Sequence, residues 1–105
     1  MSESERGRGG TGKAAEPPAS ASPPERLDEL AALLTRRFSG VYATRPGGGS
    51  VLYLIRSGAG PRYVLWRPLP AAYFWYGEPD HGEQISTTAE QAAEIIGRVL
   101  GLSAR

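Results

Sequence analysis

The residues that could do chemistry in this chain are few, and they gather in two short segments. The first is Gly7–Lys13, which fits the first seven positions of a phosphate-binding loop. The eighth position, where a Ser or Thr would hold magnesium, is Ala14. Such a loop also needs a buried strand before it and a helix after it, whereas here polar residues precede it and Glu16-Pro17-Pro18 follows. The context therefore favours a flexible Gly-rich tail over nucleotide binding.

The second segment is the polar turn over residues 77–83, which contains Glu78, Asp80, Glu83 and the only His of the chain, His81. Carboxylates and imidazole are metal ligands, but this spacing matches no known ligand pattern and indicates a solvated acidic loop. The chain has no Cys, so thiolate ligands and nucleophiles are excluded. One His without a surrounding signature does not support a nucleophile–His–acid arrangement. We therefore predict a protein that is not an enzyme and that carries no cofactor or metal.

The elements that must position any site lie between Val51 and Tyr76. Three short apolar runs occur there, over residues 51–55, 63–66 and 73–76. Each is rich in β-branched or aromatic residues and is bounded by Gly or Pro, which is typical of strands. None alternates apolar with polar residues, as a half-buried strand would. These strands are therefore expected to be apolar on both faces.

A helix is predicted before these strands. Ser22-Pro23-Pro24-Glu25 has the pattern of a capping box with Pro at the first helical position. Apolar residues then recur at helical spacing from Leu27 to Phe38, with arginines in the last turn. Gly40 is the expected end of this helix.

A second helix is predicted after the acidic loop. Thr87–Glu90 has the pattern of another capping box, and Gly101 is the expected stop. The apolar side of this helix is expected to include Val99. Gly97 inside the helix costs about 1 kcal/mol relative to Ala, which indicates a close approach to the sheet.

The resulting fold class is α+β, with the order helix, four-stranded antiparallel meander, helix. The strands are expected over residues 41–45, 50–56, 62–67 and 71–76, and the short loops between them favour antiparallel neighbours. Residues 1–21 lack a periodic apolar pattern and are expected to form a disordered tail. A single domain is therefore predicted over residues 22–102.

Charge is distributed unevenly. Residues 30–77 contain six Arg and no acid, whereas residues 78–105 contain five acids and two Arg. We expect the arginines to solvate strand ends and to lie over apolar surface. The absence of Cys, of an apolar signal segment and of an apolar run of about 20 residues favours a cytoplasmic protein without membrane contact.

The order of elements is similar to that of the double-stranded RNA-binding domain, which has a helix, three strands and a helix. That family uses a basic cluster at the start of its last helix and a Gly-Pro-bearing loop between its first two strands. Here the last helix opens with Thr87-Thr-Ala-Glu-Gln and has no basic residue before Arg98, and the first strand loop lacks the expected His. The topology fits and the chemistry does not, so nucleic-acid binding is kept as an alternative.

The C-terminal half resembles another family. Tyr73-Phe-Trp-Tyr-Gly-Glu78, an acidic loop, and the Ala-rich helix from Ala89 to Gly101 resemble the end of small actinobacterial proteins without an established activity. The resemblance covers about residues 63–102. It implies a cytoplasmic bacterial protein and a strand, turn and helix in this half, and it implies no activity.

The strands suggest how the protein could act. If both helices lie on one face of the sheet, the opposite face keeps large apolar side chains, and bare patches beyond a few hundred Å² are unusual on monomers and mark interfaces. Parity along the strands places Tyr53, Tyr63, Leu65, Tyr73 and Trp75 on that face, with Arg67 among them. We therefore predict a protein-interaction module that forms a homodimer or acts as an adaptor. The alternatives are nucleic-acid binding, a small-ligand site, and an arrangement in which these aromatic residues are simply core.

Overall fold

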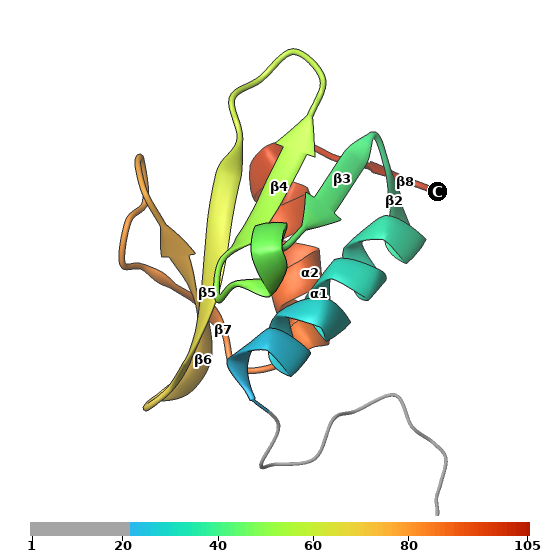
Figure 1. Ribbon diagram of the computed structural model, residues 1–105. Helices are drawn as coiled ribbons and strands as arrows, with labels where there is room; N and C mark the ends of the chain where they lie inside the picture. The colour runs from blue at the N-terminus through green and yellow to red at the C-terminus, as the bar shows by residue number, and fades with distance from the viewer. Residues whose placement is uncertain (1–21) are drawn as a thin grey trace, which may run out of the picture.

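Two helices and a five-stranded antiparallel sheet form the computed structural model of the protein, which describes residues 22–105 (Figure 1). The predicted tail over residues 1–21 lies outside this range. In chain order the elements are α1 (Pro23–Arg37), β2 (Phe38–Ser39), β3 (Val41–Thr44), the 3₁₀ turn η2 (Pro46–Gly48), β4 (Leu52–Arg56), β5 (Arg62–Pro68), β6 (Ala71–Tyr76), β7 (Gln84–Ser86), α2 (Ala89–Leu100) and β8 (Ser103–Ala104). The sheet order is β3-β4-β5-β6-β7, and β2 pairs with β8 separately. The α+β class and the antiparallel meander are confirmed, and the predicted number of four strands was wrong.

Among the five strands of the main sheet, β7 is the one that the sequence did not predict. It pairs with β6 through Tyr73 opposite Ser86 and Phe74 opposite Gln84. Only one large apolar residue of this strand, Ile85, enters the core. A three-residue strand with one apolar side chain has no detectable alternation, so it resembled the end of the acidic loop.

The first helix begins where it was predicted to begin and ends earlier. Ser22 and Glu25 form the capping box, in which the Ser22 backbone N–H donates to Glu25 Oε1 at 2.8 Å. The helix ends at Arg37, because Phe38 is extended and starts β2, where it pairs with Ala104. The predicted end at Gly40 was therefore wrong, and strand pairing continues beyond the predicted domain boundary at residue 102.

The second helix is shifted by one residue at its start. Its N-cap is Thr88, whose side chain accepts a hydrogen bond from the Gln91 N–H at 3.2 Å. The Gln91 side-chain oxygen accepts a hydrogen bond from the Ser86 hydroxyl at 2.9 Å. Gly101 ends the helix in the left-handed region, as predicted, at φ 66°. Val99 is 50% exposed, so its predicted burial was wrong.

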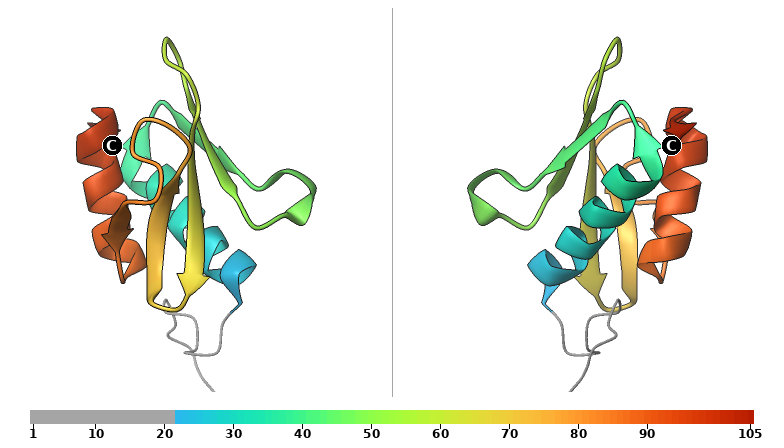
Figure 2. Two further views of the ribbon diagram at one scale, coloured as in Figure 1. Left: turned by 90° about the vertical axis from the view of Figure 1, so that its left-hand side faces the viewer. Right: turned by 90° about the vertical axis from the view of Figure 1, so that its right-hand side faces the viewer.

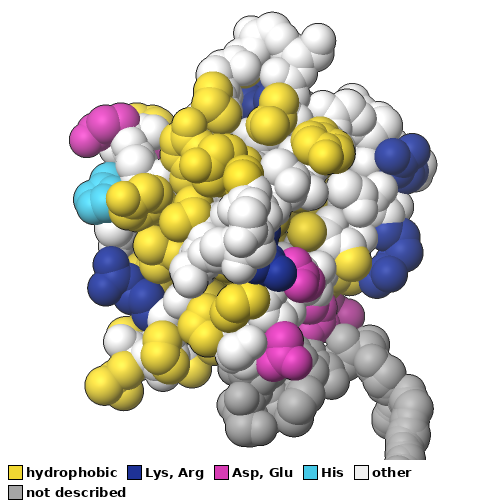
Figure 3. Space-filling model, in the orientation of Figure 1, with side chains coloured by type: hydrophobic (Ala, Val, Ile, Leu, Met, Phe, Trp, Pro, Cys, Tyr) yellow, Lys and Arg dark blue, Asp and Glu magenta, His cyan; other side chains and the backbone are white. Residues whose placement is uncertain are grey.

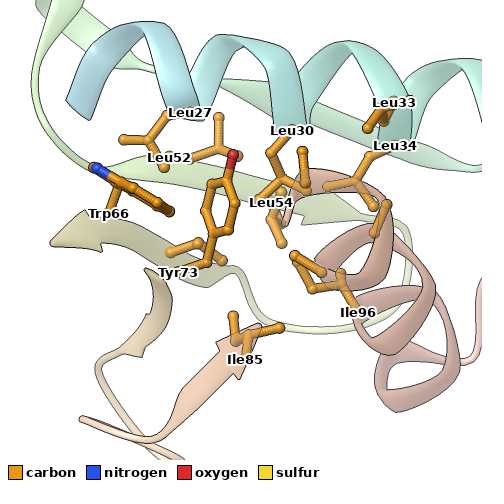
Figure 4. Close-up of a cluster of buried hydrophobic side chains, with 14 of the residues drawn as sticks. Leu27, Leu30, Leu33, Leu34, Leu52, Leu54, Trp66, Tyr73, Ile85 and Ile96 are labelled. Atoms are coloured by element: carbon orange, nitrogen blue, oxygen red, sulfur yellow. The ribbon is translucent and has the colours of Figure 1, made fainter. Parts of the chain in front are cut away.

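Both helices cover the same face of the sheet. Helix α1 packs against β3 and β5, and α2 packs against β7 and α1. In Figure 2, α1 stands in front of the strands in one view and behind them in the opposite view. Figure 4 shows the helix residues Leu27, Leu30 and Ile96 directed at the sheet residues Trp66 and Tyr73. No helix within residues 22–105 is long and apolar enough to cross a lipid bilayer.

Candidate functional site

The side of the sheet that faces away from both helices carries aromatic and aliphatic side chains. Residues paired across antiparallel strands point to the same side, so the strand register arranges these side chains in rows. The middle row is Thr44, Tyr53, Tyr63 and Tyr76. On one side of it lies the pair Tyr42–Ile55, and on the other lie the pair Leu65–Phe74 and then Arg67. We call this surface the outer face, formed by Tyr42, Tyr53, Ile55, Tyr63, Leu65, Arg67, Phe74 and Tyr76.

The outer face is open to solvent. Tyr42 is 63% exposed, Tyr76 44%, Ile55 42% and Tyr53 37%, and the remaining apolar members are half-buried. At ~200 Å² for a fully exposed tyrosine, the three exposed tyrosines alone present roughly 300 Å². With the aliphatic and half-buried members, the total is on the order of 400–500 Å², which is as large as the largest patch on a typical monomer. Figure 3 shows the hydrophobic side chains gathered on this side of the molecule.

Contacts within the outer face hold its rings in place. The rings of Tyr53 and Tyr63 meet edge to face, with centroids 4.8 Å apart. The guanidinium of Arg67 lies over the ring of Phe74, 5.3 Å from its centroid. Side chains that are already ordered lose less entropy in a contact than mobile ones do, and these contacts order part of the surface.

The structure places four of the six residues predicted for the interface on the outer face, namely Tyr53, Tyr63, Leu65 and Arg67. It does not place Tyr73 and Trp75 there. Tyr73 is 1% exposed, Trp75 is 5% exposed, and both belong to the core beneath the helices. The Tyr73 hydroxyl donates to the Arg26 carbonyl of α1 at 2.8 Å.

The error at these two positions comes from the register across the β5–β6 turn. Leu65 is opposite Phe74 and Tyr63 is opposite Tyr76, so the other parity of β6 points outward. Every residue of that strand from Tyr73 to Tyr76 is aromatic, and composition therefore does not distinguish its two faces. Prediction also missed Tyr42 and Ile55, although the two-residue spacing from Tyr53 to Ile55 could have revealed the latter.

The acidic loop over residues 77–83 borders the outer face and is held firmly. Arg62 forms an ion pair with Asp80 at 2.8 Å and lies over the Trp75 ring, 4.3 Å from its centroid. The Gly77 N–H donates to His81 Nδ1 at 2.8 Å, and the His81 ring is 5.3 Å from the Tyr76 ring. These contacts fix the loop beside the end of β6.

The loop does not assemble the ligands that its residue types suggested. Among the residues that the structure describes, no three His, Cys, Asp or Glu side chains are grouped so that they could hold a metal ion. Asp80 instead binds Arg62. Glu78 and Glu83 are exposed and form no ion pair with any other residue of the range 22–105.

The arginines of the middle segment are scattered over the fold. Arg45 donates to both carboxylate oxygens of Asp28, at 2.8 and 3.0 Å, and to the Gly49 carbonyl at 2.7 Å. The hydrogen bond from Arg45 holds the pKa of the Asp28 carboxyl below its ordinary value. Arg56 donates to the Leu100 carbonyl at the end of α2, at 3.2 Å. Because the guanidiniums of Arg45 and Arg56 are hydrogen-bonded within the fold, they give little support for a continuous phosphate-binding surface.

An open hollow of about 390 Å³ lies beside the edge strand β3 and is lined by Gly40, Val41, Tyr42, Ile55, Arg56 and Ser57. Small-ligand sites usually enclose most of the ligand surface and present a few convergent polar groups. This hollow is open at the margin of the outer face, and its one charged group, Arg56, is engaged with α2. It therefore gives less support for a small-ligand site than the outer face gives for a macromolecular contact.

The fold and this face together define a class of protein, a small two-layer α+β domain in which residues 22–105 leave one sheet face uncovered. Comparisons with protein-family models, with curated proteins and with solved structures found no match to this chain.

Proposed function

We propose that this protein is a non-catalytic protein-interaction module and that its contact surface is the outer face. The observation that carries the proposal is the placement of both helices on one side of a sheet that is apolar on both sides. The residue types agree with it, because Tyr, Phe and Arg are enriched at the centres of protein interfaces. Tyr side chains suit this role, since they combine a large apolar ring with a polar tip that tolerates water in the unbound state.

The size of the outer face indicates what kind of contact it can support. Covering on the order of 400 Å² of apolar surface contributes roughly 10 kcal/mol at about 25 cal/mol per Å². The loss of translational and rotational freedom on association costs about 4–15 kcal/mol. The two amounts are similar, so the apolar rows alone give weak binding, and polar contacts around them must supply specificity. The ordered loop beside Tyr76 and the guanidinium of Arg67 are placed to supply such contacts.

A photo-crosslinking amino acid tests this proposal directly. Introduced at Tyr53 in the centre of the outer face, it should give one discrete protein adduct in the cells that produce the protein, identified by mass spectrometry. The matched control is the same group at Val99, which is also an exposed apolar position but lies on α2. The proposal is wrong if position 53 gives no adduct, or if both positions give the same mixture of adducts.

Nucleic acid is the alternative that the same experiment excludes or supports. Aromatic rings on an open sheet can stack on unpaired bases. The outer face, however, has a single guanidinium, that of Arg67, and an acidic loop at its border, which opposes a polyanion. An adduct between position 53 and RNA would overturn the protein-interaction proposal.

A further inference from the structure

The two ends of the outer face carry opposite charges. Arg67 lies near the end of β5, three residues after Val64, and Glu78 follows β6, three residues after Trp75. Val64 and Trp75 are paired across the two antiparallel strands. Because the strands run in opposite directions, Arg67 lies about 10 Å from this pair along the strand direction, and Glu78 lies beyond the opposite end, in the turn that begins at Gly77 with φ 84°.

We infer that the partner covering the outer face is a second copy of this chain, an inference that rests on the proposed function. The arrangement that fits has a two-fold axis within the interface, running across the strands at the level of Val64 and Trp75. A rotation by 180° about this axis reverses the positions of residues along the strands, and it keeps each strand at the same position across the sheet. It therefore brings Arg67 opposite Glu78 of the partner subunit, and two-fold symmetry forms the same contact twice.

The apolar rows are complementary under the same operation. The pairs Tyr63–Tyr76 and Leu65–Phe74 lie one residue to either side of the axis. Each tyrosine pair then covers the Leu–Phe pair of the other copy, in two sheets packed face to face about 10 Å apart. Rings meet aliphatic and aromatic groups in this arrangement, and no like charges are placed opposite each other.

The charged residues are available for these contacts. Arg67, Glu78 and Glu83 are exposed, and none of them forms an ion pair elsewhere in the described part of the chain. The apolar area, on the order of 400–500 Å² per copy, is about the apolar share of a standard interface, which buries ~800 Å² in total per partner. The paired charges are exposed to solvent, so the dimer is expected to weaken as salt screens them.

Charge reversal tests both the partner and the axis. In sedimentation equilibrium over a concentration series, the unmodified chain should dimerise. Arg67→Glu and Glu78→Arg should each weaken dimerisation by roughly tenfold or more, because each homodimer then contains two like-charged contacts. An equimolar mixture of the two variants should restore it, since the mixed dimer pairs opposite charges at both contacts. Arg36→Glu, an equal charge change at the exposed end of α1, is the matched control and should leave dimerisation unchanged.

The outcomes separate this inference from the proposed function. A chain that stays monomeric up to about 1 mM, together with a crosslink from position 53 to a different protein, overturns the second-copy inference and leaves the interaction proposal standing. A dimer that neither single variant weakens, or that the mixture does not restore, overturns the two-fold arrangement. Thermal unfolding of each variant is measured alongside, and both variants should melt as the unmodified chain does at low concentration, because positions 67 and 78 lie outside the core.

Discussion

Replacing Gly97 with Ala should destabilise this domain, although Ala is the better helix former by about 1 kcal/mol. A Cβ at this position would lie 2.3 Å from Cζ of Phe38 and 2.7 and 2.8 Å from its two Cε atoms. Carbon atoms in ordinary contact are about 3.5–4.0 Å apart, so the ring would have to retreat by more than ~1 Å. Phe38 belongs to β2 and is paired with Ala104, which restrains that retreat. Overpacking of this kind costs about 1–3 kcal/mol, so the net loss should be about 0–2 kcal/mol, or up to roughly 10 °C in Tm.

A double-mutant cycle makes this reasoning refutable. In a Phe38→Ala background the obstructing ring is absent, and Gly97→Ala should then stabilise the domain by up to about 1 kcal/mol. The assay is urea unfolding followed by the fluorescence of Trp66 and Trp75, both of which are buried. A higher urea midpoint for Gly97→Ala with Phe38 in place, or the same effect in both backgrounds, would show that the close approach does not determine the choice of Gly.

Two further predictions concern the faces of the sheet and its charges. Tyr73→Ala should lower the free energy of unfolding by ~3–5 kcal/mol and Tyr76→Ala by less than about 1 kcal/mol, because only the Tyr73 side chain belongs to the core. Similar urea midpoints for the two variants would contradict the assigned faces. The pKa of Asp28 is lower in the folded than in the unfolded chain, so its stabilising contribution is present above pH ~3.9 and is lost as the pH falls through the folded pKa. The contribution is small, because the carboxylate side chain is 61% exposed and screened by solvent. Asp28→Asn should accordingly show a shallower loss of urea midpoint between about pH 4 and pH 2 at low salt, and equal slopes for both chains would count against a role for the Arg45 hydrogen bond.

The elements that could be predicted from the sequence are those with a strong local signal. Strands β4, β5 and β6 are short, apolar and bounded by Gly or Pro, and the structure contains all three. The start of α1 was also predictable, because a capping box is a local pattern of hydrogen bonds. The start of α2 was missed by one residue because two adjacent threonines both fit such a pattern, and the hydrogen bond from the Gln91 N–H to the Thr88 side chain shows which of them is the cap.

The parts that could not be predicted depend on pairing between distant residues. Strand β2 exists because Phe38 and Ser39 pair with residues more than 60 positions later, and two-residue strands have no pattern of their own. The assignment of Tyr73 and Trp75 to the wrong face has the same origin. In an uninterrupted aromatic run, register with the neighbouring strand decides which side chains point to the helices. For the candidate site, the sequence indicated an uncovered apolar face and half of its members, whereas Phe74 and Tyr76 required the register.

The edges of this sheet are poor sites for a partner, which is a further reason to place contacts on its outer face. The edge strands β3 and β7 have only four and three residues, so each offers few unpaired backbone groups. Short edges are a common protection against strand addition. The loop before β7 also folds back onto the neighbouring strand, because the Trp75 N–H donates to the Glu83 carbonyl at 2.9 Å and its carbonyl accepts from the Gly82 N–H at 2.9 Å. A strand added at either edge would leave Tyr53 and Tyr76 exposed. Only a partner that lies flat on the sheet removes these rings from water, and a second sheet with the same rows is a surface of that shape.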